Sequence, residues 1–260
     1  MTAQRILARK EGAVGWLVFN NPERRNAVSL DMWQAIPEVL ASFQSDEQIR
    51  SVVLSGAGDK AFASGADISQ FEKERASREQ VKRYDQISEQ AQRALEGFDK
   101  PVLAMIRGYC LGGGLNIANL CDLRIAADDS RFGIPAAKMG LGYRAPSMKK
   151  LVDLVGKAYA LEIMITARQF DAAEALAMGL VHKVVPVADL ERTTREYCAM
   201  IAANAPLTMR TSKRVIREIT QKTYDAPACE AWVRECFDSE DYAEGRKAFM
   251  EKRRPAFKGR

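Results

Sequence analysis

Apolar and polar positions along most of the chain follow two different periods. Short, nearly continuous apolar runs predict buried strands at residues 14–19, 51–55, 101–106, 123–127 and 180–185. Two longer segments, one starting after Ser29 and one covering residues 77–97, place apolar residues at every third or fourth position and predict amphipathic helices. Strands that alternate with helices predict the α/β fold class.

The helical period takes over toward the C-terminus. Between residues 190 and 254 nearly every segment has helical spacing, with breaks only before Pro206 and Pro227. We therefore divide the chain into an α/β core at residues 1–195 and a helical region at residues 196–260. Because this region has no sheet of its own to cover, we expect it to pack on the core or on another copy of the chain.

Composition narrows the class of protein. The 260 residues are 47% hydrophobic and 28% charged, which excludes a disordered or collagen-like chain. No apolar stretch approaches the ~20 residues that cross a bilayer, and charges flank the few apolar residues at the start. We therefore expect neither a membrane span nor a signal peptide, and we predict a cytoplasmic protein.

Cysteine and histidine counts bear on metal and redox chemistry. The five cysteines are an odd number without CxxC spacing, which predicts reduced thiols rather than disulfides or a zinc ribbon. The single histidine, His182, excludes a multi-histidine metal centre. We expect no metal site and no permanently bound cofactor.

The charge of the chain suits an anionic small molecule. The formal net charge is +5, and the basic residues are scattered except in the tail at residues 251–260. Such a balance favours partners that carry phosphate groups. It does not by itself indicate nucleic acid, and we expect neither a nucleic-acid nor a membrane partner.

A glycine triplet offers the first candidate chemistry. Gly112, Gly113 and Gly114 lie between the predicted strand at residues 101–106 and the apolar run at residues 115–120. A turn of this kind exposes backbone N–H groups at the N-terminus of a helix, where they can bind a phosphate or an oxyanion that forms on a carbonyl. The spacing is neither G-x-G-x-x-G nor a P-loop, so the dinucleotide and P-loop interpretations fail.

Taken with a loop of small residues at 60–68, the triplet belongs to a recognisable pattern. The pieces occur in order over nearly the whole chain: Asn21-Pro22, Arg25-Asn26-Ala27, residues 62–68, Gly108-Tyr109, Gly112-Gly113-Gly114, residues 121–126, residues 172–179 and residues 244–249. This order resembles the enoyl-CoA hydratase/isomerase family, also called the crotonase superfamily. The resemblance implies a crotonase-like spiral of ββα units with a helical C-terminal trimerisation region. It also implies a homotrimer or a dimer of trimers, and coenzyme A as part of a thioester substrate.

The resemblance carries roles to particular residues. It implies an oxyanion hole made by the backbone N–H groups of Ala66 and Gly113. The positions that resemble the family's coenzyme A contacts are Arg24, Arg25, Ala27, Asp67 and Ile68, with Phe249 and Lys252 from the same or a neighbouring subunit. Arg24 could equally be a solvent-exposed arginine in a turn. Asp67 could instead hold its own loop in shape.

The sequence departs from the family where proton transfer takes place. A hydratase of this family uses two glutamates, and the matching positions here are Asn116 and Ala136. Water addition needs a base for the water and an acid for the α-carbon. An amide cannot accept a proton near neutral pH, and alanine offers no polar group. We therefore expect hydration by the two-glutamate route to be weak or absent, at a site with few proton-transfer groups.

Two further residues point to alternative chemistry. Tyr143 matches a tyrosine of the family's methylmalonyl-CoA decarboxylases, and Arg144 beside it could pair with a carboxylate on the acyl chain. Loss of CO2 from a malonyl-type thioester leaves an enolate that an oxyanion hole stabilises without a base. The match is incomplete, because those decarboxylases carry a histidine at the position of Ala66. Two other interpretations stay open: Tyr143 could be a packing residue, and Arg144 could point into solvent.

Three hypotheses follow for the function. The first is an acyl-CoA thioester enzyme that stabilises a thioester enolate at Ala66 and Gly113. The second is a decarboxylase of a carboxylated acyl-CoA, and the third is a non-catalytic acyl-CoA-binding protein. The sequence does not identify the acyl group.

Overall fold

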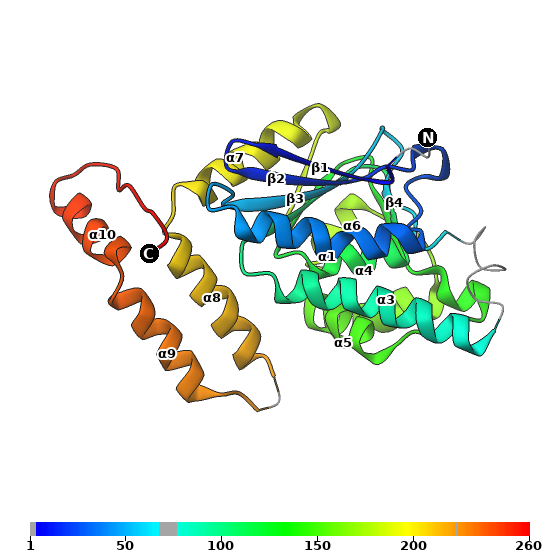
Figure 1. Cartoon of the computed structure of the whole chain (residues 1–260). Helices are drawn as coiled ribbons and strands as arrows, with labels where there is room; N and C mark the ends of the chain where they lie inside the picture. The colour runs from blue at the N-terminus through cyan, green and yellow to red at the C-terminus, as the bar shows by residue number, and fades with distance from the viewer. Residues whose placement is uncertain (1–3, 68–76, 222) are drawn as a thin grey trace.

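Two sheets form the centre of the molecule. The computed structural model describes residues 4–67, 77–221 and 223–260 (Figure 1). Ile68, a predicted coenzyme A contact, lies outside these residues. The main sheet has six strands, in the order β1 (Ile6–Glu11), β2 (Val14–Phe19), β3 (Ser51–Gly56), β5 (Val102–Ile106), β7 (Leu123–Ala127) and β10 (Lys183–Val185). The first pair is antiparallel and the other pairs are parallel.

The second sheet is short and repeats the order of the first. It consists of β4 (Ala61–Ala63), β6 (Tyr109–Leu111), β8 (Arg131–Gly133) and β9 (Phe170–Asp171). The pairs β3–β4, β5–β6 and β7–β8 each place one strand in the main sheet and the next in the second sheet. A helix follows each pair, so the chain winds as the predicted spiral of ββα units.

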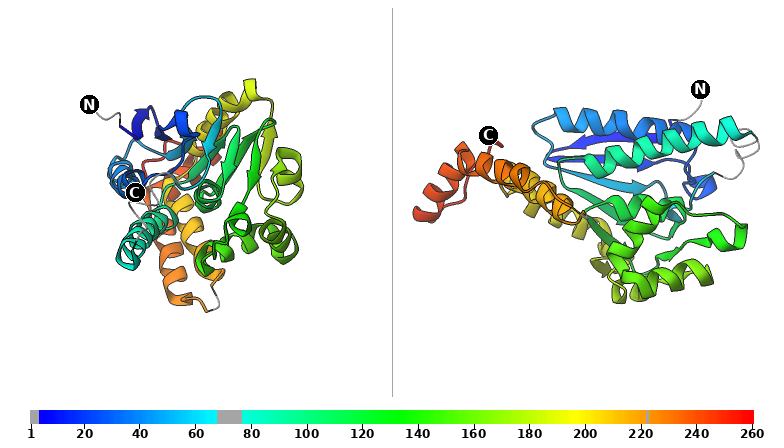
Figure 2. Two further views of the ribbon diagram at one scale, coloured as in Figure 1. Left: turned by 90° about the vertical axis from the view of Figure 1, so that its right-hand side faces the viewer. Right: turned by 90° about the horizontal axis from the view of Figure 1, so that it is seen from below.

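Helices cover the layered sheets. The helices of the core are α1 (Leu30–Ser45), α3 (Arg78–Gly97), α4 (Gly113–Leu120), α5 (Ala145–Thr166), α6 (Ala172–Ala177) and α7 (Leu190–Ala202). Figure 2 shows α1 and α3 side by side over the sheets, and the two helices are in contact. As predicted, α1 begins after Ser29, and it continues through Pro37.

The inner strands β2, β3, β5 and β7 of the main sheet are mostly buried on both faces, which explains why they are nearly continuous apolar runs. Side chains of β2 alternate between the faces: Leu17 and Phe19 pack in the cluster that includes α1, while Trp16 packs in the cluster that includes α7. Leu190 and Cys198 complete that second cluster from α7. The predicted domain boundary between residues 195 and 196 lies within α7, and the division into domains stays a prediction.

An arm of three helices follows the core. It contains α8 (Pro206–Ile219), α9 (Ala226–Phe237) and α10 (Glu240–Met250), and we call residues 206–260 the C-terminal arm. Figure 1 and the right-hand view of Figure 2 show the arm extending away from the sheets. The proline at the start of α8 lies where a helix tolerates it, because the first residue has no intrahelical N–H bond to lose.

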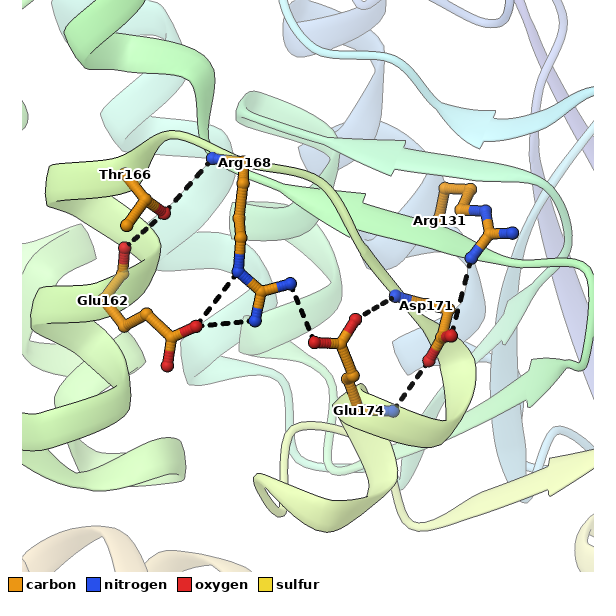
Figure 3. Close-up of polar contacts among 6 residues, drawn as sticks. All are labelled: Arg131, Glu162, Thr166, Arg168, Asp171 and Glu174. Atoms are coloured by element: carbon orange, nitrogen blue, oxygen red, sulfur yellow. Dashed lines mark hydrogen bonds and ion pairs between the residues drawn. The ribbon is translucent and has the colours of Figure 1, made fainter.

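A polar cluster ties the end of α5 to the second sheet (Figure 3). Arg168 binds Glu162 of α5 at 2.6 Å and Glu174 of α6 at 2.7 Å. Glu174 and Asp171 bond each other's backbone N–H as a capping box at the start of α6. Arg131 of β8 lies 3.8 Å from Asp171. These exposed pairs join neighbouring elements, and they lie outside the cavity described next.

In residues 4–67, 77–221 and 223–260, no helix is both long enough and apolar enough to span a bilayer.

Candidate active site

Six residues named from the sequence line one cavity. Ala66, Gly113, Asn116, Ala136, Tyr143 and Arg144 surround a space of about 480 Å³. They come from the loop after β4, the start of α4, a short 3-10 helix at Pro135–Met139 and the loop before α5. Residues far apart in sequence thus share one site, as the resemblance implied.

Two glycine-rich backbones meet at one wall of the cavity. Gly65 and Gly112 have positive φ angles of 111° and 49°, which only glycine adopts readily. A Cβ on Gly113 would lie 3.5 Å from Ala66 N, and a Cβ on Gly65 would lie 3.7 Å from Gly113 N. The two N–H groups therefore belong to segments in van der Waals contact.

The next glycine explains how the two segments come together. A Cβ on Gly114 would lie 2.1 Å from the backbone oxygen of Ala63, at the end of β4. That distance is far below any real contact, so only glycine allows α4 to begin against β4. The triplet is thus needed for close backbone approach as well as for the turn.

The N–H groups of Ala66 and Gly113 lack a hydrogen-bond acceptor among the described residues. Gly113 is the first residue of α4, so its N–H has no partner inside the helix, and the first bond of that turn is from Asn116 N to Gly112 O. Beside Ala66, Val28 accepts from Asp67 N at 3.0 Å. Both residues line the cavity, and the positive end of the α4 helix dipole lies at Gly113.

Asn116 and Tyr143 bring side-chain polar atoms into the cavity. Asn116 lies one turn after Gly113 on α4, so the two residues share a face of the helix. Asn116 Oδ1 and Tyr143 Oη are both buried, and the two side chains lie close enough to interact with each other. Burial raises the pKa of Tyr143, and the neighbouring Asn116 amide opposes that rise only in part. Tyr143 therefore stays protonated and can donate a hydrogen bond.

Arg144 lines the cavity but is already paired. Its guanidinium binds Asp85 and lies 3.1 Å from Glu89 Oε1, both on α3. Its side chain is 59% exposed, so it lies at the mouth of the cavity and partly in solvent. Asp85 also lines the cavity. The sequence analysis missed this carboxylate, although Asp85 and Glu89 have the i, i+4 spacing that places two acids on one helix face.

Ala136 is another part of the cavity wall and has no group that could transfer a proton. It is buried in the 3-10 helix at Pro135–Met139 and lines the cavity. Trp33 of α1 and Tyr84 of α3 form another part of the wall, joined by a 3.0 Å hydrogen bond from Trp33 Nε1 to Tyr84 Oη. In the sequence, both residues fit the apolar spacing of an amphipathic helix and give no sign of a cavity.

The predicted coenzyme A loop lies beside the cavity. Arg24 Nη1 lies 3.0 Å from Asp67 Oδ1, and the Asp67 carboxylate is buried. The Arg25 guanidinium lies over the ring of Tyr109 at 4.7 Å. Ala27 is buried in the same loop. The next residue, Val28, donates a hydrogen bond from its backbone N to Gly65 O. The loop is thus attached to the segment that carries Ala66.

Asn26 holds this loop in place. It has a positive φ of 55°, and its side-chain Nδ2 donates to Ala57 O at 2.9 Å and Ala61 O at 2.7 Å. Its Oδ1 accepts from Asn21 N at 2.9 Å. Asn26 is fully buried, and these bonds position the loop. In the sequence, only the resemblance to the family drew attention to this residue.

Phe249 and Lys252 do not join the cavity within one chain. Phe249 is 83% exposed near the end of α10, and it lines a second hollow of about 850 Å³ between the helices of the C-terminal arm. Lys252 follows α10 and is exposed. Figure 1 places α10 at the far end of the C-terminal arm, away from α4 in the core. This larger hollow contains none of the backbone donors described above.

His182 is not among the residues that line the cavity. Its Nδ1 accepts from Arg124 N at 3.1 Å. Burial, together with the charge of Arg124, lowers the pKa of His182. The structure describes no group of three or more His, Cys, Asp or Glu residues that could hold a metal ion in residues 4–67, 77–221 and 223–260.

Comparison with known proteins identifies the family. The family model described as enoyl-CoA hydratase/isomerase matches residues 9–260. The chain is 35% identical to a short-chain-enoyl-CoA hydratase of Clostridium acetobutylicum, with all of both chains covered (100% each). It is 32% identical to a crotonyl-CoA hydratase of Syntrophomonas wolfei, with 99% of each chain covered.

Solved structures agree with the sequence comparison. An enoyl-CoA hydratase/carnithine racemase from Magnetospirillum magneticum superposes with a TM-score of 0.94 and 38% identity, over 100% of this chain and 97% of that one. An enoyl-CoA hydratase/isomerase family protein from Hyphomonas neptunium gives 0.95 and 36%, over 99% and 98%. The chain therefore belongs to the enoyl-CoA hydratase/isomerase family. It is an acyl-CoA enzyme with the crotonase fold.

Proposed function

We propose that the cavity binds the thioester group of an acyl-CoA and stabilises its enolate through the N–H groups of Ala66 and Gly113. The observation that carries this proposal is the contact between the two backbone segments, each with an N–H that has no acceptor among the described residues. An enolate places negative charge on the thioester oxygen, and preorganised N–H donors stabilise that charge more than the neutral carbonyl. Coenzyme A enters as part of the substrate.

The reaction that follows enolate formation differs from ordinary hydration. Asn116 and Ala136 supply no acid or base where the hydratase route needs two carboxylates. We therefore expect crotonyl-CoA to be hydrated slowly, although two of the relatives are named as hydratases. An α-proton that leaves the thioester must pass to a base, and Asp85 is the carboxylate among the described residues that line the cavity. Exchange of α-hydrogens of acyl-CoA thioesters with D2O, followed by mass spectrometry, measures this enolate step.

Removal of one N–H tests the proposal. Gly113→Pro deletes the donor at the first position of α4, where helices accept proline. Gly113→Ala is the matched control, because it adds a similar Cβ near Ala66 N but keeps the N–H. We expect Gly113→Pro to lower kcat about 10²–10³-fold below Gly113→Ala, as for loss of one oxyanion donor. Equal rates in the two variants would remove Gly113 N–H from the mechanism.

The two alternatives make different predictions. A decarboxylase would release CO2 from methylmalonyl-CoA, but Arg144, its candidate carboxylate ligand, is already bound by Asp85 and Glu89. A non-catalytic acyl-CoA-binding protein would bind thioesters without α-hydrogen exchange or CO2 release. Both measurements use the same thioester panel as the test above.

The C-terminal arm supports a proposal about assembly. Large apolar side chains, including Phe237, Phe249 and Met250, are more than half exposed there. Exposed apolar surface of this extent marks a contact with another protein. We propose a homotrimer or a dimer of trimers, so light scattering should give three or six times the 28.9 kDa mass of the chain. A monomer would contradict it.

The cytoplasm is the proposed compartment. Cys110, Cys121, Cys198 and Cys229 are buried free thiols, and Cys236 is free and half-buried. Free thiols persist where the surroundings are reducing.

A further inference from the structure

A buried arginine follows α4 and has no part in the site described above. Arg124 is 2% exposed and belongs to residues 121–126, one of the segments that carry the family resemblance. Arginine is almost never buried this deeply unless a carboxylate pairs with it, because a buried charge is costly. Among the described residues Arg124 forms no ion pair, and the carboxylate of Asp122 binds Lys213 instead. Other groups must therefore compensate the charge of Arg124.

Backbone carbonyl groups hold the Arg124 guanidinium. Its Nη1 donates to Cys121 O at 2.6 Å and to Ala118 O at 3.4 Å. Its Nε donates to Leu180 O at 2.7 Å. Ala118 and Cys121 lie at the C-terminal end of α4, where the last carbonyl groups of a helix have no partner within it and carry the negative end of the dipole. Arg124 therefore places a full positive charge against the negative end of α4.

The other end of the same helix is the candidate oxyanion site. The helix begins at Gly113 and has eight residues, so its two ends are about 12 Å apart. Five of the eight residues are buried, and Figure 1 shows α4 within the core. Solvent ions therefore screen the charge of Arg124 only weakly along the helix. At about 12 Å and an effective dielectric constant of about 20, one positive charge stabilises a developing negative charge enough to change a rate about tenfold.

We propose that Arg124 is a positioning residue for the enolate step: its buried charge at the C-terminal end of α4 raises the positive potential at Gly113 N, where the thioester oxygen binds. This inference rests on the proposed function, since the oxygen must be held at Ala66 and Gly113. Arg124 is not among the residues that line the cavity, so it acts through the helix. The gain at the oxyanion site offsets the cost of burying a charge.

The polarisation of a bound carbonyl group tests this potential directly. Butyryl-CoA with an isotopically labelled thioester carbonyl is bound to the full-length protein, and infrared difference spectroscopy compares its stretching frequency when bound and when free. The frequency falls as the positive potential at the carbonyl oxygen rises. No proton has to leave the thioester, so the measurement does not depend on a base. We expect a lower frequency in the bound state of the natural protein.

Two substitutions separate the charge of Arg124 from its packing. Arg124→Gln keeps a hydrogen-bond donor without the charge, and Arg124→Met keeps only an apolar chain. Both should lose a large part of the frequency shift and slow the exchange of α-hydrogens about tenfold, while KM for butyryl-CoA changes less than about twofold. The matched control is Arg192→Gln, which removes the charge of an exposed arginine on α7 and should change neither measurement.

Asp122→Asn keeps the test decisive even if both Arg124 variants fail to fold. It removes a negative charge that acts on Arg124, so the frequency shift should be at least as large as in the natural protein. It also breaks the ion pair with Lys213, so a purely structural role of this cluster predicts a smaller shift.

Two results would overturn the proposal. One is a frequency shift in Arg124→Gln or Arg124→Met equal to that of the natural protein, even if exchange is slower, because the residue would then support only the fold. The other is a smaller shift in Asp122→Asn. If the natural protein itself gives no shift with butyryl-CoA, the proposed function fails together with this inference, whereas equal shifts in all variants contradict the inference alone.

Discussion

The cavity and the C-terminal arm are held in place by opposite kinds of interaction. At the cavity, backbone meets backbone so closely that Gly114 has no room for a Cβ beside Ala63. The arm is attached to the core by charged side chains of α8. Arg214 binds Asp99 through two hydrogen bonds of 2.9 and 2.6 Å, and Lys213 binds Asp122 at 2.6 Å.

The two kinds of attachment suit different roles for the cavity and the arm. Close backbone packing holds the proposed oxyanion donors in place, as the proposed stabilisation of an enolate requires. Partly exposed ion pairs are weaker and depend on salt, so they allow the arm to adjust to another subunit. The region that performs chemistry is therefore the one that tolerates the smallest change.

The largest expected effect is at Gly114. Gly114→Ala places a Cβ 2.1 Å from the Ala63 backbone oxygen, which no rotation of a side chain can relieve. We expect a loss of about 3 kcal/mol or more in the free energy of unfolding, from overpacking. Urea unfolding measures it.

The matched control is Gly97→Ala at the end of α3. A Cβ there has no atom within 4 Å, so this variant should keep its stability. Equal stability of both variants would show that the contact between β4 and α4 is looser than the structure has it.

Breaking the attachment of the arm should cost less. Arg214→Ala removes the paired contact with Asp99, whose side chains are 29% and 21% exposed. We expect a loss of about 1 kcal/mol in the free energy of unfolding, which shrinks as salt is raised. Faster proteolysis between α7 and α8 would follow from the same loosening. Arg234→Ala, an exposed arginine of α9, is the control on the same arm; an equal loss there would contradict a specific attachment at Arg214.

A third change sharpens the role of charge at the cavity mouth. The double variant Asp85→Asn, Glu89→Gln releases Arg144 from its two carboxylates. Affinity for methylmalonyl-CoA relative to butyryl-CoA should then rise severalfold, because a free guanidinium can bind a carboxylate. Competition binding gives this ratio. An unchanged ratio would mean that Arg144 does not reach the acyl chain.

The sequence predicted five of the six strands of the main sheet and missed β1, which is mostly exposed and has no apolar run. Strands such as Val14–Phe19 are buried on both faces, so their apolar runs are continuous and visible. The second sheet was missed because β4, β6, β8 and β9 have only two or three residues each, too few to show a period. Contacts between such short strands depend on the whole spiral.

The site was predicted through resemblance more than through pattern. No spacing rule in the sequence predicts that Ala66 lies near Gly113 or Tyr143. Their common cavity was predicted only from the order of the family's motifs. The place of Asp85 in the cavity wall was not predicted, because a carboxylate on an amphipathic helix is expected on its solvent-exposed face. Phe249 was placed by the same resemblance, and within one chain it lies on the arm, away from the cavity.

The smallest expected effect concerns His182, which lies in neither the cavity nor the C-terminal arm. Partial burial and the charge of Arg124 lower the pKa of His182 from 6.5 in the folded chain, and its neutral ring accepts the Arg124 N–H. The unfolded chain therefore binds the proton more readily. The stability that this contact contributes is complete above about pH 6.5 and is lost as the pH falls through the lower pKa of the folded chain.

His182→Asn should remove that pH dependence. The asparagine oxygen can still accept a hydrogen bond, but it does not titrate. The difference in unfolding free energy between the natural protein and the variant should therefore shift against the natural protein as pH falls from about 7.5 to about 5. Urea unfolding at several pH values measures this difference. A difference that stays constant with pH, or moves the other way, would show that His182 is not held neutral by the fold.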